Sequence, residues 1–265
     1  MCTEGVPRSN SAPRRRGEER GKVIKVKGLI MLKLICLLLV SATAGQSFAD
    51  GPREIKLPEP AKDGSLSLEK ALKQRRSVRS YLSEPISLEE LSQLLWAAQG
   101  ITKRMDKPAH WPEEREWFGG LRTAPSAGAL YPLEIYVASG RVSGLDAGLY
   151  KYIPEKHSLV PQSGEDLRDH LAEAALGQSY VRECAADIII TAVYQRVEGK
   201  YGKRADLYVP MEAGSAVQNI YLQCEPLGLG TVVIGAFSED RVKDALELPG
   251  SERPMAIMPV GRKKK

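Results

Sequence analysis

Three arginines and a serine lie within five residues of this sequence, in the order Arg75-Arg76-Ser77-Val78-Arg79. Such a cluster suits a phosphate group, because a guanidinium offers a planar fork of donors and a serine hydroxyl adds another. The alternative is an arginine run at a helix end, which interacts favourably with the helix dipole and faces water. On these residues alone, the helix-end interpretation is preferred.

Two further segments combine glycine with small residues. Residues 123–132 read Thr-Ala-Pro-Ser-Ala-Gly-Ala-Leu-Tyr-Pro, and residues 227–237 read Leu-Gly-Leu-Gly-Thr-Val-Val-Ile-Gly-Ala-Phe. Small residues let a flat ring or a phosphate approach the backbone, and free N–H groups at a helix start can donate to it, although a plain turn has the same composition. The second segment closes a helix instead of opening one after a strand, so a Rossmann dinucleotide site is not predicted.

Histidine and cysteine do not form a recognisable metal or nucleophile motif. His110, His157 and His170 are isolated from one another, and no Cys-x-x-Cys occurs. We therefore predict no metal site. Cys184 and Cys224 lie in apolar patterns and are expected to be two separately packed thiols, although an oxidising compartment would allow them to pair.

The positive charge of the chain is confined to its beginning. The formal net charge is +5, and residues 1–30 carry eight Lys/Arg against three Asp/Glu, so the remaining residues balance to zero. A basic domain surface is therefore absent, and nucleic-acid binding is not expected.

An apolar run over residues 29–40, broken by Lys33, is followed by Ser47-Phe48-Ala49. This order is typical of a secretory signal, and the run is shorter than the roughly 20 residues of a membrane-spanning helix. We expect residues 1–49 to be a basic leader and signal peptide cleaved after Ala49, with an uncleaved anchor as the alternative. The protein would then be exported, periplasmic or anchored on the outer side of a membrane, in preference to cytoplasmic, and would contact a membrane only through an uncleaved leader. Initiation at Met31 would also give a normal signal.

Residues 50–66 are rich in Pro, Gly and Lys and predict an extended lead-in, and residues 67–265 predict one domain. Ser87 and Glu90 form a capping box, and Gly100 ends the helix that follows. Residues 186–194 are apolar on both faces and predict a central strand. Residues 102–124 predict a long loop. The mixed order of elements favours α+β. Hydrophobic periodicity predicts helices over 67–74, 87–99, 165–176, 206–227 and 238–246, and strands over 133–139, 148–153, 186–194, 231–234 and 255–260.

Taken together and in this order, the segments resemble the nitroreductase family, and specifically its SagB-type branch, which includes thiazoline oxidases of peptide maturation. The resemblance covers about residues 65–262. It is carried by Arg75-Arg76-Ser77-x-Arg79, Gly100-Ile101-Thr102, residues 124–136, residues 148–152, His157, Lys200-Tyr201-Gly202-x-Arg204, Glu212-Ala213-Gly214, Gln218-Asn219, Gly228-Leu229-Gly230, Ile234-Gly235 and Pro259-Val260-Gly261.

This resemblance implies a nitroreductase-like α+β sandwich, with a central, mostly antiparallel sheet flanked by helices, in an intertwined homodimer that holds FMN between its subunits. Arg75, Arg76 and Ser77 match the positions that hold the FMN phosphate and ribityl chain, and Arg79 matches the basic residue beside N1 and O2 of the flavin. The other matching positions are Pro125, Ser126, Ala127 and Gly128 in a loop from the second subunit, Ile234 and Gly235 in the backbone near N5, and Arg262 at a late phosphate contact.

The implied activity is an FMN-dependent oxidoreductase that transfers hydride between NADH, NADPH or an organic substrate and bound FMN. Arg79 is the candidate catalytic residue, because a fixed guanidinium stabilises negative charge that develops on the reduced ring. Tyr131, Tyr201 and Trp117 are candidates for the substrate side, where a small molecule or a peptide would bind, although packing is the preferred explanation for each. An exported flavin- or ligand-binding protein without turnover is the alternative, and an exported interaction domain without a cofactor is a third.

Overall fold

The computed structural model describes residues 54–264. The expected leader, its cleavage site at Ala49 and the alternative start at Met31 therefore lie outside the described residues. Within residues 54–264 no helix is both long and apolar enough to cross a membrane.

A seven-stranded sheet forms the centre of the domain, and every neighbouring pair in it is antiparallel. The strand order is β1-β8-β7-β5-β9-β11-β10. The strands of this sheet are β1 (Ile55–Lys56), β5 (Leu133–Ser139), β7 (Gly148–Ile153), β8 (Ser158–Ser163), β9 (Ala186–Val193), β10 (Leu229–Thr231) and β11 (Glu252–Arg262). Short pairs join β2 (Ile86–Ser87) to β6 (Val142–Ser143) and β3 (Ile101–Arg104) to β4 (Gly120–Arg122).

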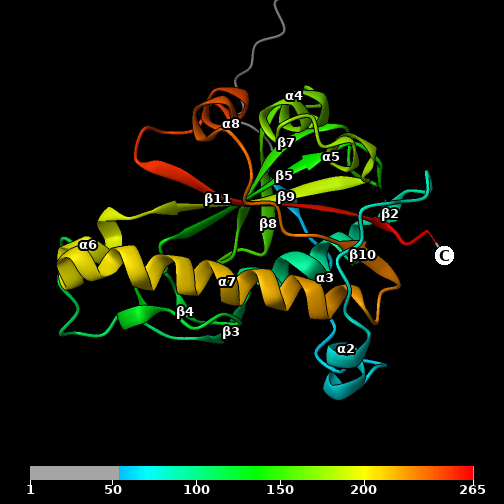
Figure 1. The fold of residues 1–265 in the computed structure, drawn as a ribbon. Helices are drawn as coiled ribbons and strands as arrows, with labels where there is room; N and C mark the ends of the chain where they lie inside the picture. Colours follow the sequence, from blue (N-terminus) through cyan, green and yellow to red (C-terminus); the bar gives the residue numbers. More distant parts are fainter. Residues whose placement is uncertain (1–53, 265) are drawn as a thin grey trace, which may run out of the picture. The chain divides into compact units, whose positions relative to one another are not determined.

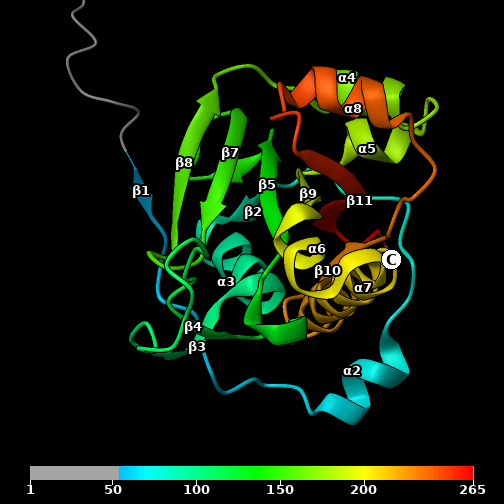
Figure 2. The same cartoon turned by 90° about the vertical axis from the view of Figure 1, so that its left-hand side faces the viewer.

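Helices cover both faces of the sheet, which makes the domain an α+β sandwich of three layers (Figures 1 and 2). One face carries α3 (Leu88–Gln99) and the 20-residue α7 (Ala205–Cys224), and the other carries α4 (Arg168–Ala174), α5 (Ser179–Glu183) and α8 (Glu239–Leu246). The remaining helices are α2 (Leu68–Gln74), α6 (Gln195–Tyr201) and the short 3₁₀ turns η1 (Ala127–Ala129) and η2 (Gly202–Arg204).

Two hydrophobic cores follow from the alternation of side chains along the strands. Ile188 and Ile190 of β9 pack in the core under α3 and α7, whereas Ile189 packs in the core under α4 and α8. Strand β9 pairs with β5 on one side and β11 on the other. The prediction that residues 186–194 form a central strand with two apolar faces is confirmed.

Local capping signals predicted several boundaries correctly. Ser67 caps α2, Ser87 and Glu90 form the expected capping box of α3, and Gly100 follows its last residue. Strands β5 and β7 have the predicted bounds.

Cys184 and Cys224 are both free and buried, as expected for separately packed thiols.

Several other boundaries were wrong. The long loop expected over residues 102–124 includes most of the β3–β4 pair, in which Ile101 pairs with Arg122. The two strands are far apart in the sequence, so local periodicity does not predict their pairing. The helix expected over 165–176 is limited to α4, because Leu176 has a φ of 59°. The helix expected over 206–227 is Ala205–Cys224, and the last strand is longer than predicted, Glu252–Arg262. The strand expected over 231–234 is displaced to Leu229–Thr231, and Ile234 forms only an isolated bridge with Ile257.

Candidate functional site

The segment from Arg75 to Arg79 leaves α2 and runs along the edge of β10. Ser77 forms a parallel bridge with Thr231, and the Val78 N–H donates to the Thr231 carbonyl over 2.9 Å. A Cβ at Gly230 would lie 2.7 Å from the Val78 side chain, so only glycine lets the segment pack this closely. The edge of the sheet therefore fixes the path of the arginine cluster.

Tyr221, in the last turns of α7, joins this segment to the strand connection that follows β10. The Arg75 guanidinium lies 5.0 Å from the centre of the Tyr221 ring. The Tyr221 hydroxyl is 3.1 Å from Ser77 Oγ, and it accepts the Val233 N–H over 2.8 Å. Sequence reasoning missed this residue, because a tyrosine within a mostly apolar helix carries no local signal that separates it from packing.

The three arginines of the cluster have different surroundings. Arg76 donates to the Lys73 and Arg75 carbonyls and so caps the end of α2, which is the alternative considered for an arginine run. Arg75 is half-buried on the Tyr221 ring. Arg79 is exposed, and its side chain forms no hydrogen bond or ion pair with residues 54–264. Arg79 and Arg75 are therefore the two cations of the cluster whose donors are not used in capping.

Ile234 and Gly235 lie close to the same edge but differ in what they can offer a ligand. The Ile234 N–H and carbonyl both pair with Ile257, over 2.9 and 3.0 Å, and its side chain is buried. Gly235 is exposed, and a Cβ there would meet nothing within 4 Å. The backbone that is open to a ligand therefore belongs to Gly235, while Ile234 fixes its position.

The loop that carries Pro125, Ser126, Ala127 and Gly128 runs antiparallel to α7. Ser126 Oγ accepts the Tyr131 N–H over 2.8 Å. Gly128 has a φ of +65°, and a Cβ there would lie 2.8 Å from the Tyr201 hydroxyl, just before α7 begins. Pro125 is exposed.

Within one chain, the arginine cluster and Gly128 face opposite ends of α7 (Figure 1). Along α7 itself, the 16 positions from Ala205 to Tyr221 correspond to about 24 Å at a rise of 1.5 Å per residue. The structure thus brings Arg75 and Ser77 against Tyr221 at one end of α7, with Arg79 and Gly235 each within two residues of a contact there, whereas Gly128 lies beside Tyr201.

Arg262 lies at the same edge as the arginine cluster but is already paired. Its two terminal nitrogens donate to the two carboxylate oxygens of Glu90 over 2.7 and 2.9 Å. The same Glu90 carboxylate accepts the Ser87 N–H in the capping box of α3. Arg262 would have to leave this pair to reach a phosphate, so its expected role stays a prediction.

The profile of the nitroreductase family matches residues 72–262 of this chain. The chain belongs to the nitroreductase family. It is 45% identical over 210 residues to the Methanocaldococcus jannaschii protein MJ1384, named as a nitroreductase, and the match covers 79% of this chain and 96% of that protein.

Solved structures show the same fold. A Ralstonia eutropha structure described as a nitroreductase superposes with a TM-score of 0.67 and 31% identity, over 80% of this chain and 90% of that one. The NADPH:FMN oxidoreductase of Vibrio harveyi, complexed with NAD+, superposes with a TM-score of 0.51 and 20% identity, over 75% of this chain and 69% of that one. The nitroreductase-like fold inferred from the sequence motifs is confirmed.

In this nitroreductase-family chain, a buried polar cluster lies beneath the Ser126–Gly128 loop. The Arg122 guanidinium donates to Gln99 and to Glu155 over 3.1 and 2.6 Å. Burial raises the pKa of Glu212 to about 7, and the Ser126 side chain and the positive charges of Arg122 and Arg196 offset part of this rise. Glu212 is therefore divided between its neutral and charged forms near neutral pH.

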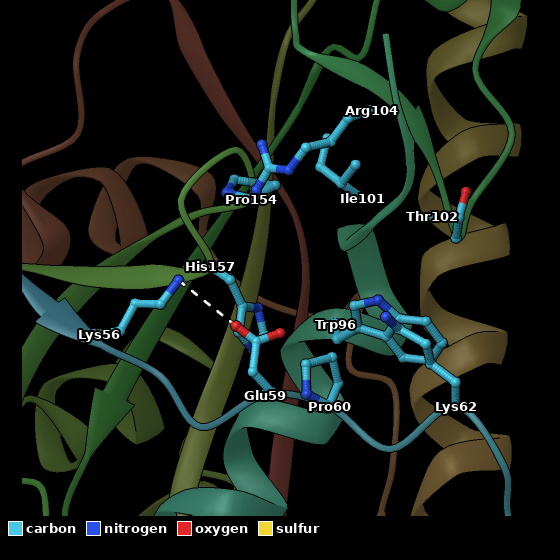
Figure 3. A pocket seen from close by; sticks show the side chains of 10 residues that line it. All are labelled: Lys56, Glu59, Pro60, Lys62, Trp96, Ile101, Thr102, Arg104, Pro154 and His157. Atoms are coloured by element: carbon cyan, nitrogen blue, oxygen red, sulfur yellow. Dashed lines mark ion pairs between the residues drawn. The ribbon is translucent and has the colours of Figure 1, made fainter.

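A separate pocket of about 200 Å³ lies under the lead-in segment (Figure 3). His157 reaches its wall, but the ring nitrogens are bonded, to Ser92 Oγ at 2.7 Å and to the Tyr152 hydroxyl at 2.9 Å. Burial lowers the His157 pKa, which favours the neutral ring. None of the expected FMN-binding residues lines this pocket. Its lining residues are Lys56, Glu59, Pro60, Lys62, Trp96, Ile101, Thr102, Arg104, Pro154 and His157.

The three aromatic residues considered for the substrate side have different positions. Tyr131 is buried, with the Arg122 guanidinium 4.5 Å from its ring centre, so it serves packing. Trp117 packs edge-on against Trp111, with ring centres 5.0 Å apart, and its indole N–H donates to the Met105 carbonyl over 3.0 Å. Tyr201 is the one whose hydroxyl lies against Gly128.

Proposed function

We propose that this nitroreductase-family protein is an FMN-dependent oxidoreductase whose flavin lies between two copies of the chain. The observation that carries the proposal is the meeting of the Arg75–Arg79 segment with Thr231 and Val233 around Tyr221 at one end of α7, although these segments are more than 150 residues apart. Charged and hydroxyl donors beside an open backbone are what a phosphate and a flat ring require.

The residues at this edge fit FMN. Arg75 and Ser77 supply a guanidinium and a hydroxyl for the phosphate, and the open backbone at Gly235 allows a ring to lie against it. When bound, FMN supplies reversible acceptance of a hydride. Arg79, which is exposed, would supply a positive charge to stabilise the negative charge that develops on a bound flavin when it is reduced. NADH or NADPH is the expected donor, which is in keeping with the name of the Vibrio harveyi enzyme.

A second copy is needed to complete the cleft. The outer face of α7 exposes 52% of Leu207 and 62% of Met211, and Gly214 near its midpoint has open space around it. Such an apolar helix face is a candidate interface. Two α7 helices packed antiparallel about a two-fold axis near Gly214 would bring the Pro125–Gly128 loop of one copy toward the Arg75–Arg79 segment of the other.

The finer assignments follow from the sequence. We assign the chain to the SagB-type branch on the motifs that run from Arg75 to Gly261. We also propose export of the mature domain after removal of residues 1–49, which mass spectrometry of protein from the native host would test. An intact Met1 or Met31 start in the soluble fraction would contradict export.

A spectrum of the purified chain beginning at residue 50 tests the proposed activity. We expect a yellow protein that releases FMN, and not FAD, on denaturation, and whose flavin absorbance bleaches when NADH or NADPH is added without oxygen. A colourless protein that fails to bind added FMN would refute the proposal. A bound flavin that neither nucleotide nor organic substrates reduce would favour a flavin-binding protein without turnover.

A further inference from the structure

The Tyr221 hydroxyl lies between two polar groups that belong to different parts of the candidate site. It accepts the Val233 N–H over 2.8 Å and lies 3.1 Å from Ser77 Oγ. The Tyr221 side chain is only 5% exposed, so water has little access to it. A phenol oxygen that accepts from Val233 keeps its own hydrogen to donate, and Ser77 Oγ is the acceptor within reach.

This arrangement leaves the hydrogen of the Ser77 hydroxyl free to donate in a defined direction. Once Ser77 Oγ accepts from Tyr221, its own hydrogen points away from the phenol, and Ser77 is exposed on that side. The Arg75 guanidinium lies over the same ring at 5.0 Å, which limits the rotamers of a long cation. One side chain thus orients two donors that face solvent.

We propose that Tyr221 is a positioning residue that orients the Ser77 hydroxyl and the Arg75 guanidinium toward the phosphate of a bound flavin mononucleotide. This inference rests on the proposed function. Tyr221 itself does not touch the phosphate, since its hydroxyl is used by Val233 and Ser77. Its contribution is to fix donors before binding, which lowers the ordering cost of the complex.

Tyr81 provides a matched comparison within the same segment. It is also buried, and its hydroxyl contacts the Val78 and Pro259 carbonyls at 2.8 and 3.0 Å. It therefore anchors the same stretch of backbone, but its hydroxyl contacts neither Ser77 nor Arg75. Loss of the Tyr81 hydroxyl should destabilise the fold without lowering the affinity for FMN relative to riboflavin.

The experiment compares FMN with riboflavin, which lacks the phosphate, by calorimetric titration of the apoprotein. Tyr221→Phe keeps the ring under Arg75 and removes the hydroxyl. We expect its FMN affinity to fall about tenfold, the effect of one hydrogen bond of about 1.4 kcal/mol, with riboflavin affinity unchanged. Tyr81→Phe should leave the ratio of the two affinities at the wild-type value.

A double-mutant cycle with Ser77→Ala tests the route of the effect. Because Tyr221 acts on Ser77, Tyr221→Phe should cause a smaller loss of FMN affinity in the Ser77→Ala background than in the wild type. Additive losses, or an equal loss for FMN and riboflavin, would overturn the positioning role and leave Tyr221 as packing. Wild-type protein that binds neither flavin would instead overturn the proposed function itself.

Discussion

Arg75 and Arg79 are four residues apart, yet their surroundings give them different functions in the proposed site. Arg75 is held over the Tyr221 ring, at the end of α2, whereas Arg79 extends from the edge of β10 with an exposed guanidinium. A phosphate carries the same charge in both redox states of a flavin, but the ring becomes more negative on reduction. Only the residue beside the ring should therefore affect the redox equilibrium.

Substitution of Arg79 should change the flavin midpoint potential, whereas substitution of Arg75 should change the affinity for FMN. Arg79→Ala is expected to lower the flavin midpoint potential, by about 30 mV for each tenfold loss in the reduction equilibrium, because the reduced ring loses its charge partner. Arg75→Ala should weaken FMN binding with little change in potential. Redox titration and FMN binding on both variants test this. An unchanged potential in Arg79→Ala, with normal FMN content, would remove Arg79 from the mechanism.

Glu212 should make stability depend on pH. Burial raises its pKa to about 7 from an ordinary value of 4.5. Between these values the folded protein keeps the proton that the unfolded chain has lost, so stability falls as pH rises toward 7 and is level above it. A shift of this size corresponds to about 3 kcal/mol.

Glu212→Gln removes this dependence, because an amide stays neutral. From about pH 5 to about pH 8, denaturant unfolding should show the variant gaining about 2–3 kcal/mol relative to wild type. Glu183→Gln, on an exposed side chain, should show no such change. A pH profile for Glu212→Gln that runs parallel to the wild-type profile would mean that Glu212 is not protonated in the folded state.

At the scale of elements, the sequence specified best those helices and strands whose signals are local. Ser87 and Glu90 fix the start of α3, and the two apolar faces of β9 fix its central place. Pairings between distant residues escaped prediction, because no local pattern shows that Ile101 will meet Arg122 or that Glu90 will bind Arg262. The contacts of Tyr221 with Ser77 and Val233 also join residues that are distant in the sequence, so they were not predicted.

The candidate site was likewise only partly predictable from the sequence. The arginine cluster could be found from residue types and from a family resemblance, but which arginine is used in capping could not. Arg76 and Ile234 were expected to contact the cofactor; Arg76 Nη1 donates to the end of α2 and the Ile234 N–H to Ile257, and their contact with a cofactor stays a prediction. The sequence shows which donors a segment carries, while the surrounding backbone decides which of them remain free.

The capping box offers a test at this scale. Ser87→Ala should destabilise the protein by about 1 kcal/mol, because the Glu90 N–H at the start of α3 loses its acceptor. Chemical denaturation measures the change, with Ser80→Ala as the control on an exposed serine. Equal stability of the two variants would show that the cap adds nothing to the helix.

At the scale of the whole molecule, the length of α7 is the main constraint on the proposed site. Gly128 packs beside Tyr201, just before α7 begins, and the arginine cluster contacts Tyr221, about 24 Å along the helix axis from Ala205. We therefore propose that one flavin takes Gly128 and Arg75 from two different copies. In the proposed dimer, each FMN is held by Arg75 of one copy and by the Pro125–Gly128 loop of the other.

The FMN content of mixed dimers distinguishes a site shared between two chains from a site built by one chain. Arg75→Ala and Pro125→Glu, the second at an exposed position, each damage both sites of their own homodimers. Co-expression with two different tags and purification on both yields the mixed dimer, in which one site combines an intact Arg75 with an intact loop from the other copy. We predict that the mixed dimer releases about half the FMN of wild type on denaturation, well above either variant alone. Mixed dimers that release no more FMN than the variant homodimers would contradict a site shared between two chains.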